Sequence, residues 1–534
     1  MNFPEIPRFI RPGLAILSGA LLALSYPRFD LFPLAFIALV PLLLAVGESR
    51  FRKAFGLGLL AGGAFFAILL YWLVPVMERF GGLSRFAAIA SLSLLVVYLA
   101  AFIGAFAAIA AHWRRHHGPA GLLIAPIAWV ALELLRARAF GGFPWGLLGY
   151  SQSENLPLLQ SAALGSVYLV SLLVAACNVA ITALILGTVR GARRTILAPA
   201  VILTLVLLAH LAGAVVLVRG TTAGEGVRIA LVQGNVAQER KWRGGAEEEI
   251  VGDLMTMTRR AAAAGARIVL WPESSSPFSF RQPVAARGGE VPAVVERTGF
   301  ADRVVALVQE LDIELIAGSV DYRVEEGRVL ALNSAFRIGA DGTLGPTYDK
   351  VRLVPFGEYV PFGPLLFFVN PLVEGAIAEF EPGRRYDPLP TRAGPAATVI
   401  CYEAIFPRVV TRIGRGASFL VNITNDAWFG RSAGPYQHLA MARVRAVELR
   451  RDLARAANTG ISALIDPYGR IVERTRLEES ALLLGRIHPR SGLTLCARLS
   501  DGGAWACAIL TVLILMRGLF RRRGSNLQPG HVTS

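Results

Sequence analysis

The sequence predicts a membrane protein in which an α/β domain is inserted between apolar helices. Of its 534 residues, 54% are hydrophobic and 17% are charged, and the mean hydropathy is +0.51. Water-soluble domains are roughly 45–50% apolar and about 25% charged. The apolar residues are concentrated up to about residue 219 and again at 503–519, whereas residues 224–499 have the composition of a soluble domain. A block of that length can bury its own core.

We expect four segments: a transmembrane domain of about seven helices at 1–220, the α/β domain at 221–500, a last transmembrane helix with a basic end at 501–523, and a disordered tail at 524–534. A membrane span needs about 20 mostly apolar residues. The predicted spans are 13–26, 31–46, 54–74, 86–111, 121–135, 161–187, 196–218 and 503–519. The first two are short and also fit a tight helical hairpin. No small-residue cleavage site follows the first apolar run, so we expect it to be retained as an anchor.

The loops between the predicted spans indicate the orientation of the chain. Basic residues follow every even-numbered span, for example Arg50, Arg52 and Lys53 after the second and Arg114 and Arg115 after the fourth. The alternate loops carry fewer. Because basic loops stay in the cytoplasm, we expect both termini there. Seven spans precede the α/β domain, which is therefore expected on the opposite side of the membrane.

The net charge of +16 does not indicate a nucleic-acid partner. Residues 224–499 contain 34 Lys and Arg against 31 Asp and Glu, so most of the basic excess lies in the membrane part and the tails. This distribution is typical of membrane topology. The sequence contains no basic stripe, RNA-binding signature or zinc-ligand spacing, and we expect neither nucleic acid nor metal to bind.

Short β-branched runs alternate with helical segments in the α/β domain, which favours an α/β fold with two sheets or one large sheet. The predicted strands are 227–233, 267–271, 313–319, 334–338, 397–401 and 419–424. The predicted helices are 247–264, 300–311 and 438–456. Residues 462–475 have the pattern of a hairpin with a glycine turn.

Three residues of this domain are candidates for catalysis. Cys401 and Glu273 each end a β-branched run, and Lys350 is one of three lysines among 54 basic residues. Taken singly, Cys401 also fits a buried strand cysteine and Glu273 a turn cap. Together a thiol, a carboxylate and an amine indicate covalent acyl transfer. In that reaction Glu273 accepts the thiol proton, provided that burial raises its pKa towards neutrality, and Lys350 stabilises the thiolate and the oxyanion.

The motifs around these residues resemble the Glu-Lys-Cys triad of the nitrilase, or carbon–nitrogen hydrolase, superfamily. Glu273 lies in Leu-Trp-Pro-Glu-Ser, Lys350 in Tyr-Asp-Lys and Cys401 in Ile-Cys-Tyr-Glu. The resemblance implies an α-β-β-α sandwich for the soluble block. Two further segments, 350–361 and 422–430, together with the seven-plus-one arrangement of spans, are similar to the membrane-anchored apolipoprotein N-acyltransferase family of bacteria.

This resemblance implies a ping-pong reaction without a metal or organic cofactor. With Glu273 as general base and Lys350 as oxyanion stabiliser, Cys401 attacks the sn-1 ester of a phospholipid, usually phosphatidylethanolamine. The thioester then acylates the α-amine of the S-diacylglyceryl cysteine of an apolipoprotein. The implied setting is the bacterial inner membrane, with the sandwich in the periplasm and both termini in the cytoplasm. We expect a monomer.

The resemblance also implies supporting roles. Glu358 positions Lys350, while Tyr402 and Glu403 form a functional pair after the cysteine, with the Tyr402 backbone N–H completing the oxyanion hole. Trp242 aligns with a substrate-binding tryptophan, with packing as the alternative interpretation.

An apolar segment, 361–371, follows directly after Glu358 and contains Phe362, Phe367 and Phe368. It is too apolar for an ordinary solvated loop. We expect these phenylalanines to form a substrate-binding lid that dips into the membrane interface. The alternative is packing against the membrane helices.

The sequence leaves two other functions open. A membrane-tethered amidase or nitrilase-type hydrolase would use the same three residues and admit water to the thioester, although one membrane anchor would suffice for it. A transporter or lipid-binding scaffold would carry ionisable residues inside its spans, where Glu133 and His210 are the few candidates.

Overall fold

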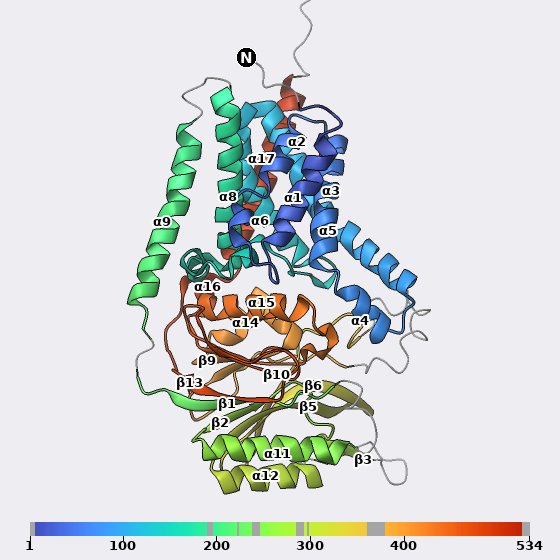
Figure 1. The fold of residues 1–534 in the computed structure, drawn as a ribbon, viewed down its shortest axis with the longest axis vertical. Coiled ribbons are helices and arrows are strands. Elements are labelled where there is room, and N and C mark those ends of the chain that lie inside the picture. Colours follow the sequence, from blue (N-terminus) through green and yellow to red (C-terminus); the bar gives the residue numbers. More distant parts are fainter. Residues whose placement is uncertain are drawn as a thin grey trace, which may run out of the picture.

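A helical bundle and a layered α/β domain are stacked along the long axis of the molecule in the computed structural model (Figure 1). The structure describes residues 6–189, 196–221, 224–237, 246–284, 293–295, 298–359 and 380–525. Both ends of the chain build the bundle, because α17 (Gly502–Ser525) returns to pack against α6 (Ala125–Arg136) and α8 (Ala162–Val189) after the α/β domain is complete.

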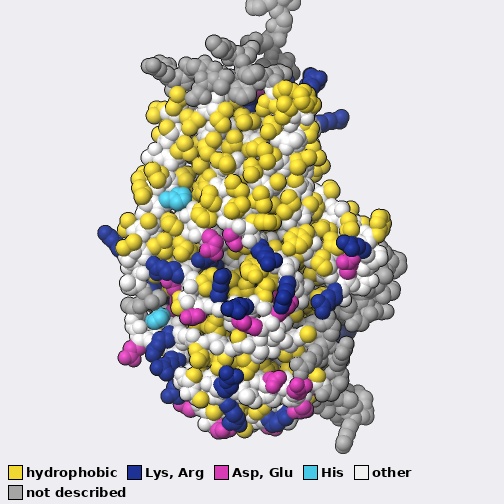
Figure 2. Space-filling model, viewed as in Figure 1, with side chains coloured by type: hydrophobic (Ala, Val, Ile, Leu, Met, Phe, Trp, Pro, Cys, Tyr) yellow, Lys and Arg dark blue, Asp and Glu magenta, His cyan; other side chains and the backbone are white. Residues whose placement is uncertain are grey.

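The other elements of the bundle are α1 (Arg11–Leu24), η1 (Phe32–Phe36), α2 (Val40–Val46), α3 (Phe51–Leu69), α4 (Leu73–Arg79), α5 (Arg85–His117), η2 (Gly118–Ile124), η3 (Ala139–Gly141), η4 (Leu148–Gln152), α7 (Leu156–Leu159) and α9 (Leu197–Arg219). Figure 2 shows hydrophobic side chains over this end of the molecule and most of the charged ones over the rest. Such an outer surface suits helices whose backbone groups are satisfied internally in a bilayer, and the chain is a membrane protein.

Helices occupy every segment in which a span is predicted, but they differ in length. Four runs are long and apolar enough to cross a membrane, namely Phe51–Leu69, Arg85–Arg136, Ala162–Gly187 and Leu197–Arg219. Shorter apolar helices lie at Arg11–Leu24, Phe32–Val46 and Gly502–Arg517. The predicted fourth and fifth spans fall together in the second of the long runs. The count of eight spans therefore stays a prediction.

Two β-sheets face each other in the α/β domain, and helices cover the outer face of each (Figure 1). One sheet has the order β13-β1-β2-β5-β6-β7 and the other β12-β11-β10-β9-β8. Helices α11 and α12 cover the first sheet, and α14 and α15 lie between the second sheet and the bundle. This is the predicted α-β-β-α sandwich, and of the two arrangements that the strand pattern allowed, the one with two sheets is present.

The sandwich is built from the following elements: β1 (Val227–Gln233), α11 (Glu247–Ala263), β2 (Ile268–Trp271), α12 (Gly299–Leu311), β5 (Glu314–Glu325), β6 (Arg328–Ile338), β7 (Leu344–Asp349), β8 (Ala396–Ile400), η8 (Cys401–Ile405), α14 (Pro407–Gly414), β9 (Phe419–Thr424), η9 (Asp426–Phe429), α15 (Gly434–Leu449), β10 (Leu453–Ala457), β11 (Ala463–Ile465), β12 (Ile471–Arg474), β13 (Ala481–Ile487) and α16 (Leu495–Leu499). A separate ribbon pairs β3 (Gln282–Val284) with β4 (Ala293–Val295).

Strand β1 shows how one sheet contributes to two cores. Ile229 and Leu231 belong to the apolar cluster between the sheets, whereas Ala230 and Val232 pack with residues of α11 and α12. Successive side chains of a strand point to opposite faces, so a strand buried on both faces is an unbroken apolar run. The core between the sheets continues through α15 into the helical bundle as a single cluster of buried residues.

The chain departs from prediction after the middle of α15. The sequence predicts a helix over 438–456, but α15 ends at Leu449, and Arg450 adopts a left-handed conformation with φ 53° and ψ 50°. Residues Leu453–Ala457 form β10, which pairs in parallel with β9. Alanine and arginine favour helices intrinsically, and pairing with a buried neighbouring strand overrides that preference. Strands β7 and β13 are also absent from the predicted set.

Buried polar groups join α15 to the bundle. Glu448 accepts hydrogen bonds from Ser166 Oγ at 2.7 Å and from the Val167 backbone N–H at 2.8 Å. Arg445 lies 2.8 Å from the same carboxylate and donates to the Tyr150 hydroxyl at 3.1 Å. Both charged side chains are 1% exposed. They therefore depend on each other and on the docked bundle for partners.

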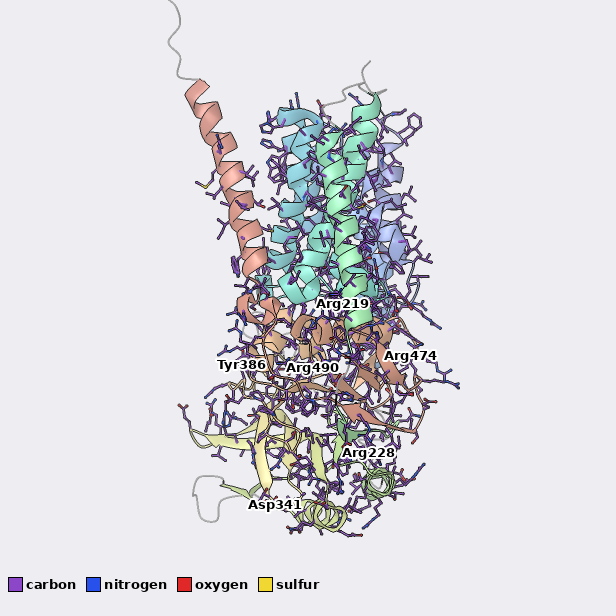
Figure 3. All side chains as sticks on the ribbon, turned by 90° about the vertical axis from the view of Figure 1, so that its left-hand side faces the viewer. Arg219, Arg228, Asp341, Tyr386, Arg474 and Arg490 are labelled. Atoms are coloured by element: carbon purple, nitrogen blue, oxygen red, sulfur yellow. The ribbon has the colours of Figure 1, made fainter. Side chains whose placement is uncertain are left out.

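Arginines of the sandwich also bind the chain where it leaves α9. Arg470 donates to the carbonyls of Leu217 and Gly220, and Arg490 donates to the carbonyl of Thr221. Figure 3 places Arg219, Arg474 and Arg490 at the level where the bundle meets the sandwich, with Arg228 and Asp341 farther away. These bonds satisfy carbonyls at the end of α9 that have no partner within the helix.

Replacement of Glu448 by Ala is expected to destabilise the protein strongly, because Arg445 would stay buried without its counter-ion. Removal of one partner of a buried ion pair costs about 3–5 kcal/mol. Thermal unfolding in detergent should show a drop of several degrees in Tm. The exposed pair of Arg259 and Glu310, whose side chains are 49% and 56% exposed, is the matched control. Glu310→Ala should change the Tm little, and an equal drop in both variants would contradict the prediction.

Candidate active site

Three strand ends bring Glu273, Lys350 and Cys401 together between the sheets. Glu273 follows β2 after Pro272, and Lys350 follows β7 directly, so both come from the first sheet. Cys401 follows β8 of the second sheet and begins η8. All three side chains are buried. Glu273 and Lys350 both act electrostatically on the Cys401 thiol, so the predicted triad forms one site to which both halves of the sandwich contribute.

Lys350 links two carboxylates. Its Nζ donates to Glu273 Oε1 and to Glu358 Oε1, each at 2.8 Å. Asn333 Nδ2 donates to the same two oxygens at 2.8 and 2.7 Å. Burial on its own would lower the pKa of Lys350, but the two carboxylates raise it well above its usual range. The ammonium is therefore charged at rest.

The resting charge of Glu273 differs from the expectation drawn from the sequence. Burial favours its protonated form, yet Lys350 and the bond from Asn333 hold the pKa of Glu273 below its usual range. Its second oxygen accepts a hydrogen bond from the Asn425 backbone N–H at 2.9 Å. The expectation of a pKa near neutrality is wrong, because the neighbouring cation outweighs burial. Glu273 is therefore ionised at rest.

The Cys401 thiol is protonated at rest. Burial and the charge of Glu273 raise the pKa of Cys401, and Lys350 opposes them only in part. The backbone of Cys401 has φ 49°, a conformation that is uncommon for residues other than glycine. Such strained positions persist where the surrounding structure fixes them, and they cluster at active sites. A neutral thiol next to an ionised carboxylate can give up its proton as it attacks.

The two remaining glutamates of the predicted site differ in what they contact. Glu358 binds Lys350 through Oε1 and accepts from the Val354 backbone N–H through Oε2 at 2.8 Å. Glu403 is fully buried and accepts from the Tyr348 hydroxyl at 2.9 Å. It also accepts from the backbone N–H groups of Val351 and Ile400 at 2.6 and 2.8 Å. Glu403 thus ties the loop of Lys350 to the strand of Cys401.

Tyr402 is half-buried beside Cys401, and its ring packs edge-on against Phe406 with centroids 5.1 Å apart. The other predicted binding residues lie outside the described part of the chain, as does segment 361–371 with the lid expected there. These residues are Trp242, Phe362, Phe367 and Phe368.

Sequence reasoning missed the polar residues that support the triad. Asn333 bridges Glu273 and Glu358 from β6, and His438 on α15 lies 3.1 Å from the carbonyl oxygen of Cys401. Asp426, at the start of η9, lies 2.9 Å from the same histidine. A faint signal was available for Asp426, because it belongs to the segment 422–430. Asn333 and His438 stand in no pattern that distinguishes them before the chain folds.

Two known families match the two parts of the chain. Residues 18–180 match the apolipoprotein N-acyltransferase N-terminal domain, and residues 228–492 match the carbon-nitrogen hydrolase family. An apolipoprotein N-acyltransferase of Geobacter metallireducens is 40% identical over 531 residues, covering 99% of this chain and 98% of that protein. Its counterpart in Azotobacter vinelandii is 35% identical, with 97% and 98% covered. The crystal structure of Saccharomyces cerevisiae Nit3, a nitrilase-superfamily member, is 20% identical with a TM-score of 0.38, covering 51% of this chain and 93% of Nit3.

Gly318 is needed because the backbone that carries Glu273 passes close to it. A Cβ at this position would lie 2.4 Å from the Pro272 carbonyl oxygen and 2.6 Å from Glu273 Cα. Gly318→Ala is expected to displace Glu273 and to slow the alkylation of Cys401 by iodoacetamide about tenfold or more. Mass spectrometry of the labelled protein measures this rate. Gly252→Ala, where the new Cβ meets nothing within 4 Å, should react like the wild type, and equal rates in all three proteins would contradict the prediction.

Burial raises the pKa of Glu403 from 4.5 to about 7, so the folded state holds this proton more tightly than the unfolded state. The resulting stabilisation is complete below about pH 4 and is lost as the pH rises through 7. The shift corresponds to ~3 kcal/mol. The Tm of the wild type in detergent should therefore fall more steeply between pH 5 and pH 8 than that of Glu403→Gln. Parallel curves would show that Glu403 does not titrate in this range.

Proposed function

This chain belongs to the apolipoprotein N-acyltransferase family, and we propose that Cys401 carries the acyl chain between the two substrates as a thioester. The activity is the transfer of an acyl group to the N-terminal amine of an apolipoprotein. The observation that carries the thioester proposal is the ionised Glu273, bonded to Lys350 at 2.8 Å, next to a buried thiol. This arrangement supplies a nucleophile, a base and a fixed cation in one site.

In the first half-reaction, Sγ of Cys401 attacks the ester carbonyl carbon of a phospholipid while Glu273 accepts the thiol proton. Lys350 and the Tyr402 backbone N–H stabilise the oxyanion that forms. When the intermediate collapses, the ester C–O bond breaks. Glu273 then returns its proton to the oxygen of the departing lysophospholipid, which leaves a thioester on Cys401. Glu358 and Asn333 keep the ammonium in place through this cycle.

In the second half-reaction, the free α-amine of a diacylated apolipoprotein attacks the thioester carbonyl. The new C–N bond forms, Glu273 accepts a proton from the nitrogen, and the C–S bond breaks. The proton then returns to Sγ, which restores the resting thiol of Cys401. Both half-reactions use the same base, Glu273, and the same cation, Lys350. A single ping-pong site therefore accounts for the whole reaction.

Two features favour acyl transfer over the hydrolysis that a membrane-tethered amidase would catalyse. Cys401 is 7% exposed, so a thioester formed there is shielded from bulk water. The core of the sandwich is continuous with that of the bundle, which supports a site close to the membrane in which both lipid substrates would lie. A simple hydrolase needs neither.

The two ionisable residues that a transporter could use, Glu133 and His210, each form hydrogen bonds within the bundle. Glu133 accepts a hydrogen bond from the Leu148 backbone N–H at 2.6 Å. His210 lies 2.9 Å from the carbonyl oxygen of Val206 and 3.0 Å from Asn155. Both therefore have structural partners within the bundle.

We further propose that the protein lies in the bacterial inner membrane as a monomer with phosphatidylethanolamine as donor. Both termini would be cytoplasmic and the sandwich periplasmic, as the basic residues after the even-numbered spans support. The proposed segments are the membrane domain 1–220, the catalytic domain 221–500, the last helix with its basic end 501–523 and the tail 524–534. A periplasmic site would face the diacylated amine of a lipoprotein after export.

Mass spectrometry of the purified protein tests the thioester. After incubation with phosphatidylethanolamine, the wild type should gain one acyl chain on Cys401, and a diacylated lipopeptide with a free amine should remove it. Glu273→Gln should slow formation of the adduct by at least about 100-fold, the lower part of the range for loss of a general base. Cys496→Ala, which removes another buried thiol, should behave as the wild type. Triacylated product from Cys401→Ala would overturn the proposal, and free fatty acid without product would indicate a hydrolase.

A further inference from the structure

The side chain of Gln437, on α15, is held by three separate segments of the membrane bundle. Its Oε1 accepts hydrogen bonds from the indole N–H groups of Trp145 at 2.7 Å and Trp72 at 3.2 Å. Its Nε2 donates to the backbone carbonyls of Pro27 at 3.0 Å and Leu69 at 3.2 Å. A carboxamide has two donor hydrogens and two acceptor lone pairs. All four are therefore used, and all four partners belong to the bundle.

The next residue, His438, contacts the nucleophile. Its Nε2 lies 3.1 Å from the carbonyl oxygen of Cys401, and its Nδ1 lies 2.9 Å from Asp426 and 3.1 Å from Arg455. A neutral ring protonated at Nε2 donates to Cys401 and accepts from Arg455 at Nδ1. A doubly protonated ring donates to Cys401 and to Asp426. In both states the Nε2–H group holds the carbonyl of Cys401.

This hydrogen bond acts on the strained turn of the nucleophile. Cys401 has φ 49°, a conformation that is uncommon for residues other than glycine and that persists where neighbours fix it. His438 is fixed in turn, because Asp426 accepts from Arg455 at 2.7 Å and from the Thr424 hydroxyl at 2.9 Å. All of these side chains are buried. The hydrogen bond from His438 to the Cys401 carbonyl is therefore held in a fixed geometry.

Aromatic rings from both parts of the molecule enclose this histidine. The centroids of Trp145, from the bundle, and Phe429, from the sandwich, lie 6.0 and 6.1 Å from the ring of His438. Trp145 also donates to Gln437, so a single bundle residue touches both neighbours on α15. A shift of the bundle against the sandwich would move these contacts together.

We propose that His438 is a positioning residue for Cys401 and that Gln437 makes this positioning depend on the docked membrane bundle. The bundle then has a role beyond anchoring, because it sets the geometry of Cys401 through α15. The proposal rests on Cys401 being the nucleophile. It adds a coupling between the two parts of the chain, which interacting buried networks can transmit.

The first experiment replaces His438 in the full-length protein and measures turnover with phosphatidylethanolamine and a diacylated lipopeptide in detergent micelles. His438→Gln keeps an N–H donor near the position of Nε2, whereas the side chain of His438→Asn is too short to reach the carbonyl. We expect Gln to retain most of the wild-type kcat and Asn to lose about tenfold or more, with KM unchanged within twofold. The matched control is His488→Asn, because His488 lies 3.2 Å from Asp452 in a second histidine–aspartate pair outside the site.

The second experiment replaces Gln437 by Leu and follows the alkylation of Cys401 by iodoacetamide across pH, a readout that needs no lipid. The substitution removes the four hydrogen bonds of Gln437, and all of their partners lie in the bundle. We nevertheless expect Cys401 to be alkylated more slowly and the pH profile of the alkylation rate to shift. A rise in the KM for phospholipid with unchanged alkylation would overturn the coupling. Equal kcat values for the Gln and Asn variants of His438 would overturn the positioning role. Product from Cys401→Ala would instead show that Cys401 is not the nucleophile. Neither of the two results above would imply this, so the two failures can be distinguished.

Discussion

The buried ammonium of Lys350 is the interaction on which the catalytic part of the structure depends. Its side chain is 1% exposed and contacts Glu273 and Glu358 at 2.8 Å. An unpaired charge at this depth would carry a desolvation penalty of several kcal/mol, so β2, β7 and the loop that carries Glu358 must meet in one register. The same cation keeps Glu273 ionised beside the neutral thiol of Cys401. Folding and readiness for catalysis are therefore set by one group of charges.

A second constraint follows from the position of α15. One face of this helix covers the sheet that delivers Cys401, and the other meets the membrane bundle, where Glu448 and Gln437 find their partners. One cluster of buried apolar residues also spans the sandwich and the bundle. The two parts of the chain consequently share a core and do not behave as a soluble enzyme on a tether. This arrangement fixes the position of the site relative to the helical bundle.

The sequence-based predictions are accurate where local interactions decide the structure. They fail where contacts between residues distant in the sequence decide it. Strands buried on both faces, such as β1 and β9, are apolar runs whose ends are visible in the sequence. Cys401 and Glu273 follow such runs, and Lys350 is recognised by its rarity and its motif. By contrast, β10 has the composition of a helix and becomes a strand through its pairing with β9. The pKa of Glu273 was mispredicted for a similar reason, since its direction depends on Lys350, 77 residues away in the sequence.

The sequence by itself determined the membrane character of the protein, the α/β class of its soluble block, and the thiol, carboxylate and amine of its site. These properties depend on local composition, on periodicity and on short motifs. The tertiary structure alone added Asn333 and His438 to the residues that support the triad, because they act through contacts between distant strands and helices. It also decided the charge of Glu273 and the link from the bundle to Cys401 through α15. Electrostatics and hydrogen bonding act over a few ångströms in space, and chain order does not fix which groups come that close.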